Sequence, residues 1–343
     1  MHFRGGERRP GWSGYTAFVL SGGGARGAVQ VGMLRALLEA GERPDVIVGT
    51  SIGAWNGAWL ARHPNLEGLN ELEDLWHGLT SSKVLLGRET YGAPPARAIA
   101  GMLVLSAARR VAQGAPSLYS DAGMSQLVER LIGNWTFEDL TLPMRVIAAN
   151  LSHGGRAVFY SGPLAPPVLA SSAIPGIFPP VRIGEQVYVD GGALENASLD
   201  VAYDLGARRL FVLDVGYDSN TDENALWAAV SQHHVEHARQ STTHALAAVL
   251  ERTAQVMSRY HLEQALRRLP PGIEVHVLSG TTAGGLLDFG RSAELMQQGY
   301  ARTQAHLGAL SPSTTNVAEH DSNGERALAS TALTDRASMA ASA

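Results

Sequence analysis

The sequence of 343 residues contains no cysteine, which excludes disulfide bonds, thiolate zinc sites and cysteine nucleophiles. Charged residues make up only 17% of the chain and leave a net charge of -5, so we expect no general attraction to nucleic acid and a weak repulsion from anionic membranes. No stretch supplies the roughly 20 apolar residues that are needed to span a bilayer.

The N-terminal residues also lack the features of a secretory signal. Arg4, Arg8 and Arg9 stand among glycines, and the apolar run that follows is interrupted at Ser21 by three glycines. This run is too short and too polar for a signal peptide, so a soluble cytoplasmic protein is expected. The composition predicts a flexible segment 1–14, one globular α/β domain at 15–310 and a disordered tail at 311–343, which is rich in Ser, Thr, Ala, Asn and Asp.

Strand and helix patterns alternate near the N-terminus. An apolar strand at 16–20, a helix at 28–40 and a strand at 46–48 form one strand-helix-strand unit, which predicts a parallel sheet. Further strands are predicted at 144–149, 156–160, 181–183, 186–189, 210–215 and 273–278. Further helices are predicted from 52 onward and at 66–79, 98–111, 124–132, 198–205, 223–269 and 292–307. Asp121 is the expected N-cap of the helix at 124–132. The apolar helix 98–111 is interpreted as a core helix, with a cap over a lipid site as the alternative.

The motif G-x-S-x-G stands between the second strand and the helix that follows it, with Gly49, Ser51 and Gly53 in the required places. A strand-to-helix turn this sharp leaves no room for side chains on either flank of the serine. The turn lifts the hydroxyl clear of the backbone, near the positive end of the following helix. Ser51 is therefore a candidate nucleophile.

A glycine-rich turn follows the first strand and has the sequence Gly22-Gly23-Gly24-Ala25-Arg26-Gly27. Glycines allow consecutive N–H groups to point into one concavity, which predicts an oxyanion hole. If the two strands are neighbours, this turn lies beside Ser51. The same turn fits the dinucleotide fingerprint G-x-G-x-x-G, but the second strand ends in Gly49-Thr50-Ser51 and not in the acidic residue that nucleotide binding requires.

Asp190 is the leading candidate for the catalytic base, because it ends an apolar strand and is followed by Gly191 and Gly192. The alternative is an ordinary turn aspartate, since Asp-Gly is a frequent turn pair. Asp214, at the end of another strand, is either a second carboxylate of the site or a helix cap.

Histidines offer a rival base, which would give a Ser-Asp-His triad of the α/β-hydrolase type. His276 interrupts the apolar alternation of its strand and is predicted to point from the face opposite to Val275 and Val277, while His153 lies in a Gly-rich turn. The segment His233–His237 contains H-x-x-E-H, an inverted zincin pattern, but it lies in a polar stretch without a third ligand. No metal site is therefore expected.

Taken together, these motifs resemble the patatin-like phospholipase family. The matching pieces are the turn 22–27, then 49–53, then Asp190-Gly191-Gly192, and the segment 170–180 before the aspartate also looks like the family. The likeness covers about 15–215 and extends more weakly to 310. One local departure is Ala197, where relatives often have a proline.

The resemblance implies a three-layer α/β/α fold with a central, mostly parallel sheet, a nucleophile elbow and flanking helices. It implies hydrolysis of lipid acyl esters through a Ser-Asp dyad, with Ser51 as nucleophile, Asp190 as proton acceptor and no histidine. The oxyanion hole would be Gly22, Gly23, Gly24, Ala25, Arg26 and Gly27, and the motif glycines would be Gly49, Gly53, Gly191 and Gly192. No cofactor and no nucleic acid partner are expected, while transient, peripheral contact with a membrane surface is. A histidine-triad esterase and a non-catalytic nucleotide-binding or interaction module remain the alternatives.

Overall fold

The computed structural model describes residues 14–87, 96–216, 242–280 and 285–310. Its strands are β1 Tyr15–Leu20, β2 Val46–Thr50, β3 Met144–Asn150, β4 Arg156–Phe159, β5 Val181–Ile183, β6 Gln186–Asp190, β7 Ala207–Asp214 and β8 Glu274–Ser279. Its helices are α1 Gly27–Glu39, α2 Ile52–Arg62, α3 Leu66–His77, α4 Ser81–Leu86, α5 Ala96–Ala112, α6 Ala122–Ile132, α7 Ala165–Ser171, α8 Leu199–Asp204, α10 Thr242–Arg268 and α11 Ser292–Leu310.

The strands form one mixed sheet in the order β5-β6-β3-β2-β1-β7-β8, and β4 also pairs with β3. Strands β3, β2, β1, β7 and β8 run parallel to one another. Strands β4 and β6 run antiparallel to β3, and β5 runs antiparallel to β6. The sheet is therefore mostly parallel, as the strand-helix-strand unit at the N-terminus predicts.

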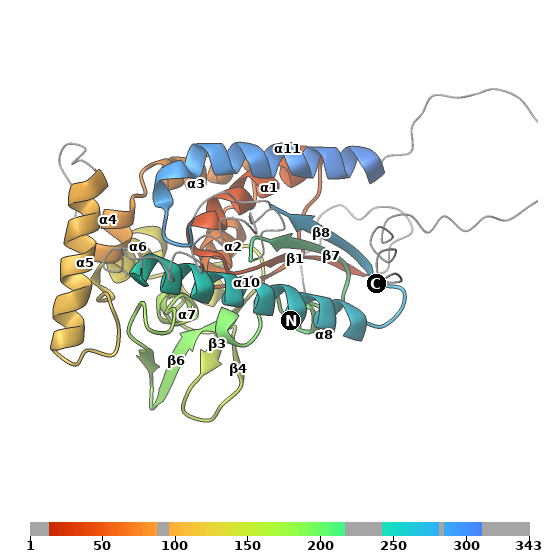
Figure 1. Cartoon of the computed structure of the whole chain (residues 1–343). Helices are drawn as coiled ribbons and strands as arrows, with labels where there is room; N and C mark the ends of the chain where they lie inside the picture. Colours follow the sequence, from red (N-terminus) through yellow and green to blue (C-terminus); the bar gives the residue numbers. More distant parts are fainter. Residues whose placement is uncertain (1–13, 88–95, 217–241, 281–284, 311–343) are drawn as a thin grey trace, which may run out of the picture.

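Helices cover both faces of this sheet, because alternate residues of the buried strands point to opposite sides. Phe18, Ile47 and Phe211 pack with α1, α2 and α11, while Ala17 and Leu210 pack with α8 and α10. Figure 1 shows α1, α3 and α11 above the sheet and α8 and α10 below it. The three-layer α/β/α architecture is confirmed.

Most predicted elements agree with the structure to within a few residues, but helices α4 and α7 have no predicted range of their own. Pro166 and Pro167 lie in the first turn of α7, where proline is favoured in a helix. In the sequence alone, the same proline pair is typical of an irregular segment. Asp121 is the N-cap residue of α6, as predicted, although its side chain makes no capping hydrogen bond. The segments 1–13 and 311–343 and the pattern His233–His237 lie outside the described residues.

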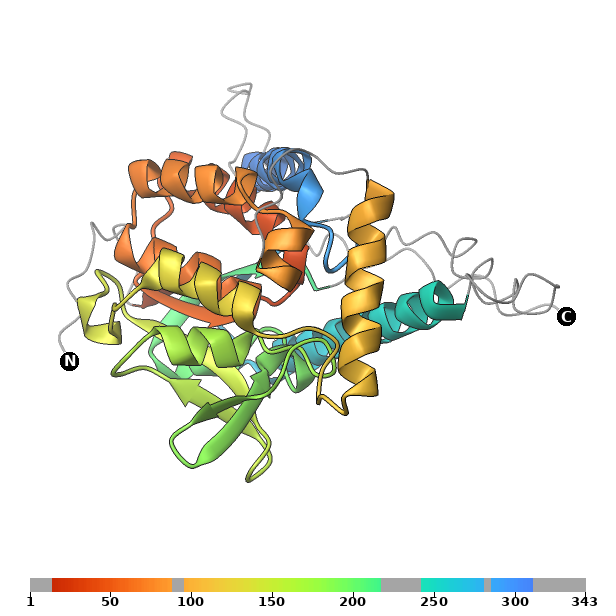
Figure 2. The ribbon, with the colours of Figure 1, turned by 90° about the vertical axis from the view of Figure 1, so that its left-hand side faces the viewer.

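The interpretation of 98–111 as a core helix is wrong for the part whose side chains are described. Val104, Leu105 and Val111 of α5 are between 61% and 72% exposed. Figure 2 shows α5 as a rod on the outside of the molecule. Within the described ranges we find no helix that combines the length and the apolarity that a membrane crossing requires.

Candidate active site

The register of β3 places Ser51 next to Asp190. Thr50, the last residue of β2, pairs with Ile147, and Asp190, the last residue of β6, pairs with the adjacent Ala148. Strand β4 occupies the other flank of both β3 residues. Since β2 is parallel and β6 antiparallel to β3, the two strands run toward each other along one flank and end at the same point. The fold therefore joins two residues that are distant in sequence.

The side chains of Ser51 and Asp190 make a direct hydrogen bond. Ser51 Oγ donates to Asp190 Oδ2 at 2.6 Å, and Gly192 N–H donates to Asp190 Oδ1 at 2.8 Å. Both residues are buried, since Ser51 is 5% exposed and Asp190 is 6% exposed. Burial raises the pKa of Asp190 to about 6, although the hydrogen bonds from Ser51 and Gly192 favour the charged form. Asp190 is thus ionised at neutral pH and can accept the Ser51 proton.

Ser51 has a strained backbone. With φ 55° and ψ -125°, it is the only non-glycine residue with positive φ in the described part of the chain. Such a conformation costs of order 1–3 kcal/mol and persists only where the surroundings hold it. Here Ser51 N–H donates to Ser171 Oγ at 2.8 Å, and Ser171 Oγ donates to the Ile147 carbonyl at 2.5 Å. These bonds tie the nucleophile turn to β3.

The glycines that flank Ser51 are required by close backbone contacts. A Cβ at Gly49 would lie 2.6 Å from the Gly53 carbonyl oxygen, and a Cβ at Gly53 would lie 2.3 Å from the Leu20 carbonyl oxygen. Gly191 is similarly tight, because its Cβ would lie 2.6 Å from the Ile147 carbonyl oxygen. The structure therefore supports the steric reason for expecting glycine at these positions.

The glycine-rich turn 22–27 lies beside Ser51, but most of its N–H groups already have acceptors. Gly22 N–H donates to Asn196 Oδ1, Ala25 N–H to the Leu286 carbonyl and Arg26 N–H to the Gly23 carbonyl. Gly27 N–H donates to the Gly24 and Ala25 carbonyls and closes the 3-10 turn Gly24–Arg26. Among the described residues, no acceptor is found for the N–H groups of Gly23 and Gly24. Only part of the predicted loop is therefore available to bind an oxyanion.

Asn196 is a residue of the site that the sequence does not reveal. It is buried, its Oδ1 accepts from Gly22 N–H at 2.9 Å, and its Nδ2 donates to the Gly22 carbonyl at 3.0 Å. Nδ2 also donates to Ser258 Oγ of α10 at 2.8 Å. A Cβ at Gly22 would lie 3.0 Å from Ser51 Cβ, so Asn196 holds the residue of the loop that packs on the nucleophile.

Asp214 and the candidate histidines have other partners. Asp214 Oδ1 accepts from Gly216 N–H at 3.0 Å, so this buried carboxylate holds the turn after β7, and burial raises its pKa. His276 points from the predicted face, where its ring stacks on Phe211 at 4.8 Å and its Nε2 lies 2.5 Å from Glu274 Oε1.

His153 is exposed in the turn between β3 and β4. In the described part of the chain, no histidine forms a hydrogen bond with Ser51 or Asp190. Nor do the same ranges contain a group of three or more His, Asp or Glu side chains placed to hold a metal ion.

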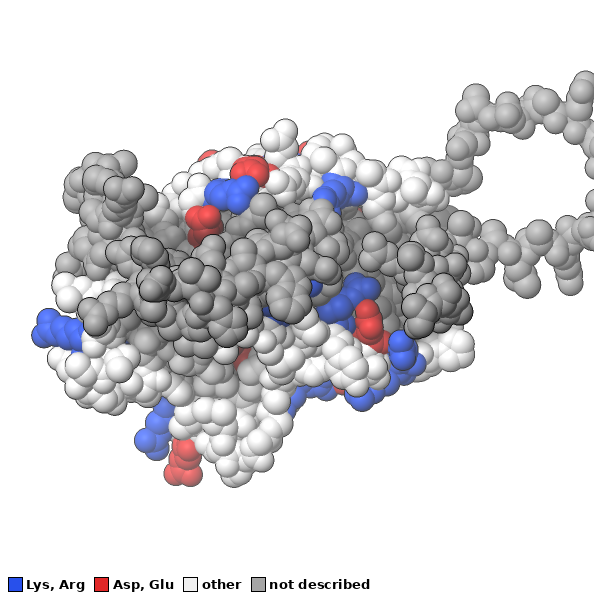
Figure 3. Space-filling model, in the orientation of Figure 1, with Lys and Arg blue, Asp and Glu red and all other residues white. Residues whose placement is uncertain are grey.

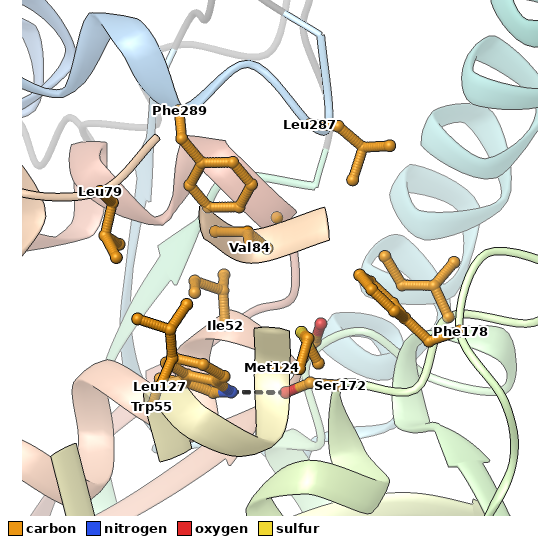
Figure 4. A pocket seen from close by; sticks show the side chains of 13 residues that line it. Ile52, Trp55, Leu79, Val84, Met124, Leu127, Ser172, Phe178, Leu287 and Phe289 are labelled. Atoms are coloured by element: carbon orange, nitrogen blue, oxygen red, sulfur yellow. Dashed lines mark hydrogen bonds between the residues drawn. The ribbon is translucent and has the colours of Figure 1, made fainter. Parts of the chain in front are cut away.

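An apolar pocket opens next to Ser51 and encloses about 440 Å³, part of which is open to solvent. Its walls come from α2, α4, α6 and the segments before α4, after α7 and before α11, as Figure 4 shows. The lining residues are Gly24, Ser51, Ile52, Trp55, Leu79, Val84, Met124, Leu127, Ser172, Ile174, Phe178, Leu287 and Phe289. Trp55 Nε1 donates to Ser172 Oγ at 2.7 Å, so its polar atom is satisfied and its ring contributes apolar surface.

The chain is similar in sequence to one protein family and to several of its members. The family model described as patatin-like phospholipase matches residues 18–203. The chain is 32% identical to mouse patatin-like phospholipase domain-containing protein 7 over 209 residues, which cover 60% of this chain and 14% of that protein. It is 28% identical to lysophospholipase nte1 of Aspergillus terreus over 334 residues, which cover 94% of this chain and 20% of that protein. The chain thus spans a fifth or less of the length of these relatives.

Solved structures with similar backbones include VipD from Legionella pneumophila and human GIVD cytosolic phospholipase A2. The first has a TM-score of 0.45 and 17% identity and covers 86% of this chain and 67% of that one. The second has a TM-score of 0.46 and 12% identity and covers 87% of this chain and 58% of that one.

Proposed function

The chain belongs to the patatin-like phospholipase family, and from this premise we propose that it is a serine hydrolase that cleaves acyl esters of lipids. The observation that carries the proposal is the 2.6 Å hydrogen bond from Ser51 Oγ to Asp190 Oδ2, in a buried site that opens into an apolar pocket. A serine that donates to a buried carboxylate is a nucleophile with its base already in place.

The reaction begins when Ser51 Oγ attacks the ester carbonyl carbon and its proton passes to Asp190 Oδ2. The negative oxygen of the tetrahedral intermediate is bound by the N–H groups of Gly23 and Gly24, and the positive end of α1 lies behind them. The intermediate collapses, the C–O bond to the alcohol breaks, and Asp190 returns the proton to the leaving oxygen. Water then attacks acyl-Ser51 with Asp190 as base, which releases the fatty acid and restores the serine.

The pocket supports an acyl chain as the bound group. Its wall is made mainly of aliphatic and aromatic side chains, to which an alkyl chain can bind by loss of apolar surface. Since such substrates reside in membranes and micelles, transient contact with a membrane surface is part of the same proposal.

The alternatives receive no comparable support from the described residues. A nucleotide needs polar or cationic groups for its phosphates, whereas the pocket beside the glycine-rich turn is apolar and Arg26 is paired with Glu251 at 3.2 Å. A histidine triad needs an imidazole next to Ser51, and the carboxylate of Asp190 occupies that position.

The test is a panel of esters assayed with the wild type and Ser51→Ala side by side, comprising phosphatidylcholine, lysophosphatidylcholine, a triacylglycerol and a soluble butyrate ester. Ser172→Ala serves as a matched control, because this second buried serine lines the same pocket and, among the described residues, its hydroxyl bonds Trp55 Nε1 and the Val168 carbonyl but not Asp190. We expect Ser51→Ala to lose all measurable turnover and Ser172→Ala to keep most of it. Wild-type rates in folded Ser51→Ala would refute the hydrolase proposal.

A further inference from the structure

The middle of helix α10, residues 249–260, carries its apolar side chains on the outside. Val249, Leu250, Val256, Met257 and Tyr260 are between 40% and 61% exposed. These positions follow the helical repeat, so they form one outward stripe. Between 249 and 260, none of the exposed positions of α10 is charged. An outward apolar stripe on a helix of a folded domain indicates a surface that has a partner.

The inner side of the same helix is polar because it serves the active-site loops. Ser258 accepts from Asn196, which holds Gly22. Glu251 accepts from Arg26 Nη1 at 3.2 Å and from Leu286 N–H at 3.1 Å. The residue after Leu286 lines the pocket. The exposed stripe of α10 thus lies on the back of the helix that holds the glycine-rich turn and one wall of the pocket.

Helix α5 also exposes apolar side chains to solvent, in the part whose side chains are described. Val104, Leu105 and Val111 are strongly exposed and, with the exposed Ala108 and Ala112, follow the helical repeat. All charged residues in the sequence of α5 are arginines, and Arg109 is exposed between these apolar positions. Helix α5 packs on α4, whose Val84 lines the pocket.

Helix α5 lies beside the N-terminal part of α10, as both Figures 1 and 2 show. The large face in Figure 3 shows charged side chains of the described residues singly or in mixed groups, without a broad patch of one sign. Helix α5 packs on α4, and α10 binds Leu286 through Glu251, so both stripes lie on helices that contact parts of the pocket wall or the residues next to it.

We propose that the stripes of α5 and α10 form one docking surface for a phospholipid membrane and turn the pocket toward the bilayer. This inference rests on the proposed function, because it supplies the route by which a membrane lipid reaches Ser51. A helix with apolar residues and arginines on its exposed side is suited to the headgroup boundary, where the arginines meet phosphate groups. A tyrosine such as Tyr260 is also favoured there. A second copy of this chain fits less well, because its stripes offer the arginines no acidic residue.

The test is co-sedimentation with phosphatidylcholine vesicles, carried out in the Ser51→Ala background so that the lipid is not hydrolysed. Leu105→Glu and Leu250→Glu place a charge on one stripe each. Leu151→Glu is the matched control, because Leu151 is 57% exposed in the turn between β3 and β4 and the change in net charge is the same. We expect each stripe variant to weaken vesicle binding about tenfold and the control to leave it unchanged. With Ser51 restored, the stripe variants should hydrolyse a soluble butyrate ester at the wild-type rate and vesicle phospholipid about tenfold more slowly.

Equal vesicle binding by the stripe variants and the control would overturn the docking surface. So would a stripe variant that turns a dimer into a monomer in sedimentation velocity, since a second copy would then occupy the face. If the soluble ester is not hydrolysed by the wild type, the proposed function fails, whatever the binding result.

Discussion

Asn196→Ala tests a feature of the site that the structure shows and the family motifs do not contain, which is the anchoring of the glycine-rich turn by Asn196. Asn196 contributes three hydrogen bonds, two to the Gly22 peptide and one to Ser258 Oγ. Alanine removes all three, so the buried Gly22 N–H loses its acceptor and the Gly22 carbonyl keeps only the longer bond from Ser21 Oγ at 3.3 Å. Each bond is worth about 0.5–1.5 kcal/mol net, so we expect the free energy of unfolding to fall by roughly 1.5–4.5 kcal/mol.

The catalytic effect should exceed what stability alone predicts. Gly22 precedes the N–H groups that we assign to the oxyanion, and a shift of about 1 Å in such groups lowers a rate about a hundredfold. The acyl pocket does not include Asn196, so KM should change little while kcat falls.

The assay is steady-state hydrolysis of a soluble butyrate ester at a temperature well below the Tm of the variant. Ser258→Ala is the control, because it removes only the bond to α10 and leaves both bonds to Gly22. Its kcat should stay within about threefold of the wild type. If folded Asn196→Ala keeps the wild-type kcat, Asn196 does not position the oxyanion loop.

Further predictions concern the oxyanion loop, Asp190 and the pocket. Gly24→Ala should lower kcat about a hundred- to thousandfold, since its Cβ would lie 2.2 Å from the Leu286 carbonyl oxygen. Gly41→Ala is the control, because Gly41 also has positive φ but a Cβ there would meet no atom within 4 Å. It should lower the stability of the fold and leave kcat unchanged. The kcat/KM of the wild type should fall below about pH 6 and level off above it, because burial raises the pKa of Asp190 to about 6 and only the ionised form accepts a proton. The pKa of Asp190 is higher in the folded than in the unfolded chain, so ionised Asp190 lowers the free energy of unfolding. The Tm of Asp190→Asn should therefore exceed that of the wild type by more at pH 8 than at pH 5. An equal difference at both pH values would contradict the assigned pKa shift. Leu127→Trp narrows the pocket and should shift the preference from octanoate toward butyrate esters, measured as a ratio of kcat/KM values.

Local features of the active-site turns could be predicted from the sequence because their causes are local. The strand before Ser51, the helix after it and the two flanking glycines are neighbours in the chain, and the same holds for the turn at 22–27. Hydrogen bonding within the turn is not local: Gly22 N–H is bound by a side chain 174 positions away. The sequence alone therefore cannot show which N–H groups remain available.

Asp190 illustrates what depends on register. A strand that ends in Asp-Gly-Gly looks like a turn, and its contact with Ser51 exists because β2 and β6 end at adjacent residues of β3. The local pattern made Asp190 the leading candidate for the base, but only the order of motifs in the family favoured that role over an ordinary turn aspartate. For α5, the repeat of apolar residues predicts a helix, but the same repeat is compatible with a stripe that faces the core or the solvent.

The most direct measurement of the Ser51–Asp190 dyad is the rate at which a fluorophosphonate labels the protein, followed by intact mass and peptide mapping. The wild type should take up one equivalent on Ser51, and Asp190→Asn should keep its fold and label at least about a hundredfold more slowly, because its amide cannot accept the serine proton. Labelling of Asp190→Asn at the wild-type rate, or an adduct on another residue, would contradict the dyad.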